Sequence, residues 1–373
     1  MRFAATEEEV MVQDMLGRAL KEATEAALRI QGYAPRPEPE ALRRKLGDLG
    51  LWGAWLPESA GGADGGPRML MTLARGLGRM PMFHGLIGAG VLPGAILSRA
   101  EGAEATGLAS RLAAGETPVA VAAMEPGARW DLTSPETRAE PDGTGVRLTG
   151  TKVHVADGAS AEVFIVSART DRGIGLFLVP AGAEGLTVTP YPVTDGTTWV
   201  TLKADGIALP GSARLIGPDD GAATLDKAFT LAAFAASAEI LGSCEAALTH
   251  TLDYLRTRKQ FGSPLATKQA LQFRAADLHT DIEMLSSQVV GAANALASGY
   301  NRNARANVAA AMCLAVQTGD LVGREAIHMH GAIGMTRELG IGQHLLRADV
   351  LARWLGSAEH YRAQFTAFEE DAA

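Results

Sequence analysis

The sequence predicts an α+β protein in which helical regions flank a middle region of short β-strands. Two changes of pattern carry this expectation. Helical periodicity fills the first part of the chain and returns after about Asp219, whereas short apolar runs with turn signals lie between about Pro118 and Pro218. We therefore expect an N-terminal helical domain over residues 1–117, a middle β-barrel or sandwich domain over residues 118–218, and a C-terminal four-helix-bundle domain over residues 219–373.

Helix signals open the N-terminal domain. Thr6 and Glu9 form a capping box, which predicts a helix that runs to about Ile30. A second helix is expected to begin at residues 35–38 and to end in the glycine-containing stretch 47–53. The glycines at 61, 62, 65 and 66 predict a loop, and a third helix follows near residues 70–77.

The middle domain alternates short apolar runs with turn residues. Asp-Gly pairs at 142–143 and 157–158, and the stretch 171–173, are the turn signals. Short strands with this spacing are typical of a small barrel or sandwich. The candidate strands are residues 146–148, 153–155, 163–167, 174–179, 186–190 and 200–203.

Helical periodicity defines the C-terminal domain. One helix is expected to start near Thr267, because the apolar residues at 271, 278, 282, 285 and 289 keep to one face. Two longer helices, over residues 228–254 and 305–328, are rich in alanine and apolar on several sides. Such helices are usually buried against other helices, often across a subunit interface, so we expect an oligomer.

Composition excludes several classes of function. The chain of 373 residues has 34 basic and 42 acidic residues, and its net charge of −8 argues against nucleic acid or an anionic membrane as the main partner. Two cysteines, Cys244 and Cys313, cannot build a disulfide framework or a thiolate zinc site. The N-terminus lacks a signal pattern and the longest apolar stretch, residues 228–238, is too short to span a membrane, so we expect a cytoplasmic protein.

Four segments stand in an order that is informative as a whole. On a helix–β–helix layout, this order resembles the acyl-CoA dehydrogenase family over roughly residues 40–360. The third segment is the most specific of the four. The segments are residues 46–62 (LGDLGLWGAWLPESAGG), 123–128 (AMEPGA), 254–278 with the run RTRKQFGSPL at 256–265, and 330–338 (HGAIGMTRE) followed by Arg347.

The resemblance implies a flavoprotein that binds FAD and forms an α,β double bond in an acyl-CoA thioester. In that chemistry a carboxylate removes the α-proton while the β-hydride passes to the flavin. The resemblance also implies a dimer or tetramer, formed either by this chain alone or with a paralogous subunit. An electron-transfer flavoprotein is one candidate for the electron acceptor.

The resemblance assigns one set of residues to the FAD of a neighbouring subunit. Arg258 matches an arginine that contacts the pyrophosphate, and Phe261 and Gln269 match residues beside the adenine and ribose. Gly331 and Gly334 match a glycine turn where the backbone approaches the dinucleotide closely. Without the resemblance, the same two glycines would equally predict the C-cap of a helix.

The residues expected to contact the flavin ring in the chain's own β domain depart from the family pattern. Met124 stands where the family has Thr or Ser, and a thioether cannot donate a hydrogen bond. His154 replaces the aromatic residue that normally packs on the flavin. Ala156 replaces the hydroxyl residue that normally bonds the flavin edge. A backbone N–H remains available to the flavin, so these changes weaken the expected site and do not abolish it.

The catalytic base of the family is missing from its usual place. The matching stretch near the C-terminus has Leu355 where the family has Glu. Some members carry the Glu early in the first long helix of the last domain, at a position near Ala232. Glu239 lies two turns further along that face, so it is a candidate base and equally a candidate structural acid. Glu359 is a second, weaker candidate.

His328 has two interpretations. With His330 it suggests a metal pair, but alternate residues of a helix face different ways and no carboxylate or cysteine stands at ligand spacing, so we expect no metal site. By the resemblance, His328 occupies a position usually held by Gln near the neighbour's FAD. Neither a G-x-S-x-G elbow nor a G-x-G-x-x-G unit is present, which argues against a hydrolase and a nicotinamide enzyme.

Three functions remain in view. The first is a self-sufficient FAD-dependent acyl-CoA dehydrogenase. The second is a non-catalytic partner subunit, which keeps the residues given to a neighbour's FAD and completes the site of a paralogous chain, an arrangement similar to that of some bacterial members in sterol side-chain breakdown. The third is an acyl-CoA oxidase or another flavin enzyme on the same fold.

Overall fold

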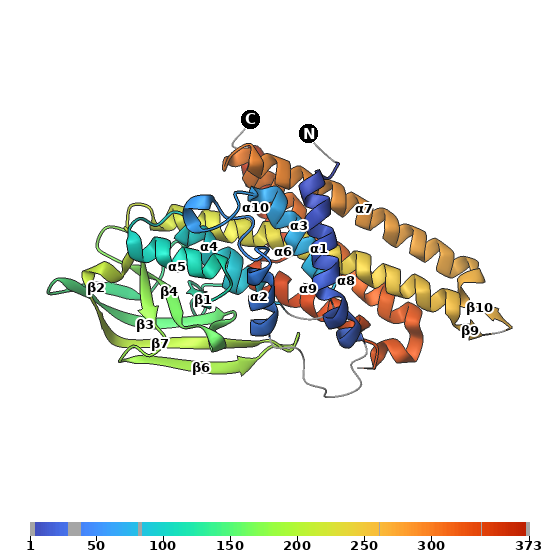
Figure 1. Ribbon diagram of the computed structural model, residues 1–373, viewed down its shortest axis with the longest axis horizontal. Helices are drawn as coiled ribbons and strands as arrows, with labels where there is room; N and C mark the ends of the chain where they lie inside the picture. Colours follow the sequence, from blue (N-terminus) through green and yellow to red (C-terminus); the bar gives the residue numbers. More distant parts are fainter. Residues whose placement is uncertain (1–3, 29–38, 81–83, 261, 337, 371–373) are drawn as a thin grey trace. The chain divides into compact units, whose positions relative to one another are not determined.

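The computed structural model describes residues 4–28, 39–80, 84–260, 262–336 and 338–370 (Figure 1). The chain divides into two compact units, each with its own set of elements. The helical unit consists of residues 1–38, 67–84 and 233–373, and the sheet unit consists of residues 39–66 and 85–232.

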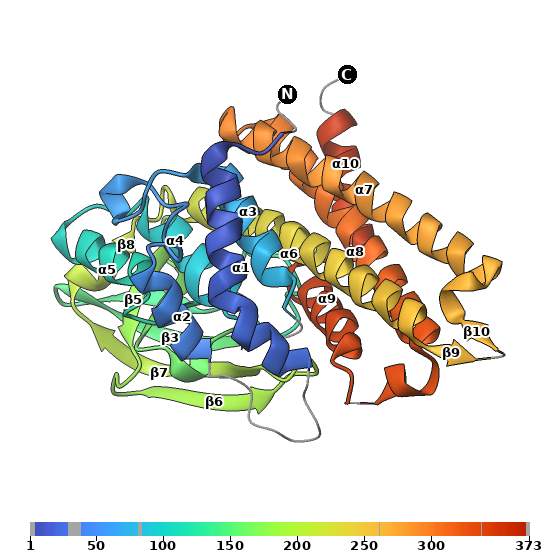
Figure 2. The same cartoon turned by 45° about the vertical axis from the view of Figure 1, so that its right-hand side comes forward.

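Long α-helices build the helical unit, in which α8 packs against α7, α9 and α10. A short antiparallel hairpin of β9 (Lys259–Gln260) and β10 (Ser263–Pro264) joins α6 to α7 (Figure 2). The helices are α1 (Glu7–Leu28), α3 (Gly66–Gly78), the larger part of α6 (Gly221–Thr257), α7 (Gln269–Ala297), α8 (Arg302–His330), α9 (Ile341–Leu355) and α10 (Ala358–Glu370), with 3₁₀ turns at η5 (Leu265–Thr267) and η6 (Gly331–Met335).

Local sequence signals explain where several of these helices begin and which face they bury. The capping box is confirmed, because the backbone N–H of Glu9 donates to Thr6 Oγ1 over 3.0 Å and the N–H of Thr6 donates to Glu9 Oε2 over 3.1 Å. Asn301 caps α8 in a similar way, by accepting the N–H of Ala304. In α7 the predicted apolar face is buried at 278, 282, 285 and 289, as expected for an amphipathic helix.

Within the described ranges of the chain, two helices are long and apolar enough to cross a membrane by length and composition alone. The window in α6 is 94% buried within the protein, and the window over Arg302–Met335 is 56% buried. Burial of this kind is what a core helix of a soluble protein shows, and it agrees with the expectation that these Ala-rich helices pack against other helices.

An eight-stranded sheet dominates the sheet unit, with the strand order β6-β7-β3-β2-β4-β5-β8 and β1 paired in parallel with β4. Its apolar core includes Leu148, Phe164 and Phe177. The strands are β1 (Val119–Ala122), β2 (Arg138–Asp142), β3 (Gly145–Val155), β4 (Val163–Arg169), β5 (Ile174–Pro180), β6 (Leu186–Pro192), β7 (Thr198–Leu209) and β8 (Arg214–Ile216).

The structure differs from the predicted strands in two respects. The runs at 146–148 and 153–155 belong to one long strand, β3, whose pairing with β7 shifts register between Lys152 and Val155. A bulge of this kind admits an extra residue, and His154 lies there with a φ of 56°. Strands β1, β2 and β8 were not predicted, because each is short or, in the case of β2, mostly exposed and polar.

The sheet unit also contains short helices. The predicted second helix is α2 (Pro39–Asp48), and its expected start at residues 35–38 lies outside the described residues. The apolar stretch after residue 85 forms a π-helical turn, η2 (Leu86–Val91), and then α4 (Leu92–Leu97). A further helix, α5 (Ala103–Ala113), and the 3₁₀ turns η1 (Glu58–Ala60), η3 (Gly158–Ser160) and η4 (Gly211–Ala213) complete the unit.

The order of helical, sheet and helical regions therefore agrees with the predicted fold class. The exact three-domain division at 117/118 and 218/219 stays a prediction. Helix α6 begins at Gly221, close to the second boundary, and continues from the sheet unit into the helical unit.

Candidate functional site

One end of the helical unit collects the described residues that were expected to contact a neighbour's FAD. The rings of Tyr254, near the end of α6, and His330, at the end of α8, stack with their centroids 4.5 Å apart. The β9–β10 hairpin then leads from α6 to the start of α7 (Figure 2). We call residues 258–260, 262–274 and 325–336 the bundle tip.

Arg258 is exposed at the bundle tip and its guanidinium has no partner among the described residues. By contrast, the neighbouring Arg256 forms an ion pair with Asp253, with 2.9 Å between Nη1 and Oδ1. Lys259 and Lys268, also at the tip, likewise have no side-chain partner within the described part of the chain. An unpaired guanidinium is well suited to bind an anionic group such as a diphosphate.

The two glycines predicted for this site have clear backbone roles. Gly331 has a φ of 68° and is the C-cap of α8, where its N–H bonds the carbonyl of His328. A Cβ at Gly334 would lie 2.5 Å from the carbonyl oxygen of Ile327, so only glycine fits without a shift. Both are therefore explained by the end of the helix, and their contact with FAD stays a prediction.

The positions of the other residues predicted for this site give less evidence for or against a cofactor contact. Gln269 is the exposed first residue of α7. Phe261 lies outside the described residues. His328 is exposed, and its Nδ1 lies 3.0 Å from Nη1 of Arg274 on α7. The same Nη1 lies 3.2 Å from Oε2 of Glu325.

In the sheet unit, a buried ion pair joins the family-like segment 123–128 to strand β3. Lys152 is 2% exposed, and its ammonium group donates to Glu125 Oε1 over 2.7 Å and to Ser167 Oγ over 2.9 Å. Glu125 also accepts the backbone N–H groups of Glu136 and Thr137. This network fixes the loop after β1 against β3, since partners of a buried ion pair must be held in good geometry.

Burial and hydrogen bonding act against each other on the pKa values of this pair. It lowers the pKa of Lys152 to about 8, although the hydrogen bond from its ammonium group to Glu125 works against this shift. Burial by itself would raise the pKa of Glu125, but the hydrogen bonds that it accepts from Lys152 and Thr137 outweigh this effect and the pKa is lowered. The pair therefore stays ionised near neutral pH.

The residues expected beside the flavin ring offer it little. Met124 and Ala156 are 5% and 3% exposed, and neither side chain has a hydrogen-bond donor. The carbonyl of Met124 accepts the N–H of Val153 over 2.9 Å. The Nδ1 of His154 lies 3.0 Å from the Tyr191 hydroxyl, and its ring meets Trp199 edge-on, with the centroids 6.2 Å apart.

The residues present fit the diphosphate of FAD better than they fit its flavin ring. The diphosphate needs cationic groups, which the bundle tip supplies through Arg258 and its lysine neighbours. The flavin ring needs donors at its edge and an aromatic surface, and in the sheet unit the side chains at 124 and 156 give no donor. The tip thus fits its part of the cofactor, whereas the side chains on the sheet side fit the flavin ring poorly.

Glu239, the first candidate base, is tied to other groups of the helical unit. It is 1% exposed, Nε of Arg347 donates to its Oε1 over 2.6 Å, and Nε2 of His84 lies 3.4 Å from the same oxygen. Burial by itself would raise the pKa of Glu239, but Arg347 and His84 outweigh it and lower the pKa to about 2. A carboxylate held ionised in this way is a weak proton acceptor.

The space around Glu239 within the helical unit is also small. The cavity that it lines with Arg347 and His344 measures about 10 Å³, which is room for one water molecule at most. Leu355, at the end of α9, is 5% exposed and brings no carboxylate to the family position. Glu359 is exposed in the first turn of α10. The base roles of Glu239 and Glu359 stay predictions that these surroundings do not favour.

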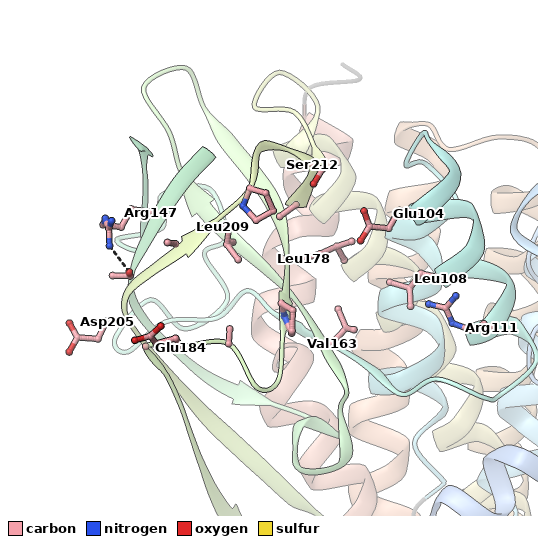
Figure 3. Close-up of a pocket in the computed structure, with 17 residues that line it drawn as sticks. Glu104, Leu108, Arg111, Arg147, Val163, Leu178, Glu184, Asp205, Leu209 and Ser212 are labelled. Atoms are coloured by element: carbon pink, nitrogen blue, oxygen red, sulfur yellow. Dashed lines mark hydrogen bonds between the residues drawn. The ribbon is translucent and has the colours of Figure 1, made fainter. Parts of the chain in front are cut away.

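A larger hollow lies elsewhere in the sheet unit, between α5 and the strands (Figure 3). Its volume is about 780 Å³, and Leu108, Leu178 and Leu209 contribute to its apolar lining. Arg147 at its rim donates to the carbonyl of Gly206 over 3.0 Å. No residue predicted for the FAD or substrate site lines this hollow.

The sequence indicated several of the charged residues of these sites, but it did not indicate which residues pair with one another. Arg347 stands after the last family-like segment and Glu125 within the second, but their pairing with Glu239 and Lys152 was not visible from the sequence. Arg274 and His84 carried no signal. Among the described residues, no group of three or more His, Cys, Asp or Glu is arranged to hold a metal ion.

Three family models match almost the whole chain. They describe the N-terminal, middle and C-terminal domains of acyl-CoA dehydrogenases, and they match residues 6–104, 120–203 and 219–367. The chain belongs to the acyl-CoA dehydrogenase family. Its fold is therefore that of a family of FAD-dependent flavoproteins, as the resemblance implied.

Several relatives are informative. The acyl-CoA dehydrogenase FadE27 of Mycobacterium tuberculosis is 31% identical over 328 residues, which cover 85% of this chain and 84% of FadE27. A structure of the steroid acyl-CoA dehydrogenase Tcur3481–Tcur3483 is 31% identical with a TM-score of 0.86, and covers 98% of both chains. The ChsE4–ChsE5 complex of Mycobacterium tuberculosis is 26% identical with a TM-score of 0.86, over 100% of this chain and 99% of the other.

Proposed function

We propose that this chain is the non-catalytic partner in a hetero-oligomeric acyl-CoA dehydrogenase. In this proposal its bundle tip completes the FAD site of a paralogous chain, which carries the catalytic base and dehydrogenates an acyl-CoA thioester. The observation that carries the proposal is the state of the two base positions. Leu355 has no carboxylate, and the carboxylate of Glu239 is buried in an ion pair with Arg347.

The contrast between the two halves of the site supports the same function. Arg258 is exposed and without a partner in the described part of the chain, so it is available to an anionic group of another subunit. On the sheet side, the side chains at Met124 and Ala156 give no donors to a flavin held by this chain itself. A chain that serves only the neighbour's cofactor would keep the first feature and could lose the second.

Two relatives add support, because both structures are named as pairs of different chains, Tcur3481–Tcur3483 and ChsE4–ChsE5. The first is described as a steroid acyl-CoA dehydrogenase. We therefore propose an acyl-CoA with a sterol-derived acyl group as the substrate class of the hetero-oligomer, and an electron-transfer flavoprotein as the acceptor of its electrons.

A self-sufficient acyl-CoA dehydrogenase is the second candidate. It is favoured by the match of all three family domains over the chain. In that case a homo-oligomer would hold one FAD per chain, and Glu239 would have to leave Arg347 to act as base. An acyl-CoA oxidase on the same fold differs from it only in passing the electrons to oxygen.

Expression of the chain alone and together with a paralogous acyl-CoA dehydrogenase separates these functions. We expect the chain alone to be colourless, and the co-purified complex to be yellow and to bleach with acyl-CoA in the absence of oxygen. A chain that purifies alone with FAD and bleaches with acyl-CoA would refute the partner function. In that event, loss of bleaching in Glu239→Gln would identify the base.

A further inference from the structure

We propose that Arg274 holds His328 in the tautomer with its proton on Nε2, so that the bundle tip presents a hydrogen-bond donor to the FAD of the partner subunit. The identity of the ligand rests on the proposed function. The tautomer rests only on contacts within this chain. Arg274 is thus a positioning residue, and His328 is the group that it positions.

The chemistry of arginine fixes the direction of the hydrogen bond. Nη1 of Arg274 lies 3.0 Å from Nδ1 of His328. A guanidinium has only donors and stays protonated, so the nitrogen that it contacts must be the acceptor. A neutral imidazole has one donor and one acceptor nitrogen, and therefore the proton of His328 must be on Nε2.

Glu325 holds the guanidinium in the position that this contact requires. Its Oε2 lies 3.2 Å from the same Nη1 of Arg274, and it precedes His328 by three residues on α8. Residues three apart lie on neighbouring parts of one helix face, so a single Nη1 with two N–H groups can serve both.

The Nε2–H of His328 is available to a ligand. His328 is exposed, and among the described residues the only hydrogen-bond partner of its imidazole ring is Arg274. It lies in the last turn of α8, three residues before Gly331 and at the same tip as Arg258. The bundle tip that carries the exposed Arg258 therefore also presents a fixed donor, which suits an acceptor atom of the dinucleotide. A glutamine amide could donate or accept, so the histidine is the more selective group.

The tautomer can be measured on the isolated chain without any flavin. Histidine labelled with ¹⁵N reports by NMR which ring nitrogen carries the proton, and about pH 8 keeps ordinary histidines neutral. We expect a protonated Nε2 and an unprotonated Nδ1 for His328.

Three variants test whether Arg274 sets this tautomer. Arg274→Met should give a mixture of the two tautomers. Arg274→Lys should preserve the native one, because an ammonium group is also only a donor. Arg324→Met, which removes an exposed arginine paired with Asp320 on α8, is the matched control for charge.

Retention of FAD by the complex tests the ligand. One lost hydrogen bond should weaken FAD binding about two- to tenfold in His328→Leu, with a smaller loss in Arg274→Met. The FAD affinity of His328→Gln should stay near that of the wild type, because the glutamine amide keeps a donor. The affinity of Arg274→Lys should also stay near it, because lysine keeps the orientation of His328. Dissociation constants for FAD, measured by flavin fluorescence on the unloaded complex, give these values without reference to turnover.

The outcomes separate this inference from the proposed function. A protonated Nδ1 in the wild type, or no response to Arg274→Met, would overturn the tautomer. The expected tautomer together with unchanged FAD affinity in His328→Leu would overturn the role toward the cofactor. A chain that binds FAD alone would refute the proposed function, and the same variants would then be measured on that homo-oligomer, with the same affinities expected.

Discussion

The bundle tip and the sheet-side strand around Lys152 each contain a cation, and the surroundings of the two cations differ in opposite ways. Arg258 is exposed, and nothing in the described part of the chain neutralises it. Lys152 is 2% exposed and bonded to Glu125 and Ser167. An unpaired surface cation is free to bind an external anion, whereas a buried and satisfied one holds the chain's own backbone in place.

A sequence that resembles its family can keep the residues that stabilise the fold without keeping those that bind a ligand. In the sheet unit the pair that supports the fold is kept, while the neighbouring positions at 124 and 156 have no group for a flavin. At the tip, the groups suited to a ligand are kept at the surface. A chain can therefore retain the full fold of its family while only one half of a shared site stays equipped for the cofactor.

Removal of the buried cation should have the largest effect. In Lys152→Met the carboxylate of Glu125 stays buried without its ionic partner, which should destabilise the protein by about 3–5 kcal/mol. Arg147→Met is the control on the same strand, because its ion pair with Asp142 is exposed and should contribute at most about 1 kcal/mol. Urea unfolding of the isolated chain measures both. Equal losses in the two variants would remove the distinction between the two regions.

Removal of the exposed cation should act on the cofactor and leave stability unchanged. In Arg258→Met the co-purified complex should lose FAD affinity by about tenfold to a hundredfold, which corresponds to one charge-assisted hydrogen bond. Arg256→Met is the matched control, since that arginine is already paired with Asp253. If both variants bind FAD equally well, the tip does not contact the diphosphate. The dissociation constants come from the same fluorescence titration.

Acid should expose the structural role of Glu239. Its pKa is lowered from 4.5 to about 2, so its contribution to stability is present above the ordinary pKa and is lost as the pH falls toward 2. Between about pH 6 and pH 3 this group alone should cost about 2 kcal/mol. The double variant Glu239→Leu with Arg347→Met should lose less stability than the wild type over the same range. Parallel losses in urea unfolding would contradict the ion pair's role.

Restoration of the sheet side should have the smallest effect. Met124→Thr with Ala156→Ser adds two hydroxyls at positions where the family has them, and each new hydrogen bond should strengthen FAD binding by the isolated chain about two- to tenfold. Ala208→Ser, which adds a hydroxyl at an exposed site of the same unit, should change nothing. Unaltered FAD affinity in the double variant would mean that other features of the sheet side exclude the flavin.

Local parts of the structure could be predicted from the sequence, and long-range pairings could not. The capping box joins Thr6 to Glu9, and the buried face of α7 repeats every three or four residues, so both are written in a short window. Glu239 and Arg347 are 108 residues apart, and Glu125 and Lys152 are 27 apart. Nothing in composition or periodicity says that such residues meet. Glu239 could therefore be named from the sequence, but a catalytic base could not be distinguished there from a structural acid.

The number of FAD molecules in the purified complex tests the central claim most directly. If this chain only completes its partner's site, each pair of one catalytic chain and one copy of this chain forms a single full site. The second site would need the sheet side of this chain, where Met124 and Ala156 give the flavin no donors. Absorbance of the released flavin against total protein should therefore give one FAD for each pair of chains. Two FAD molecules for each pair would show that this chain holds a flavin of its own, and would contradict the account.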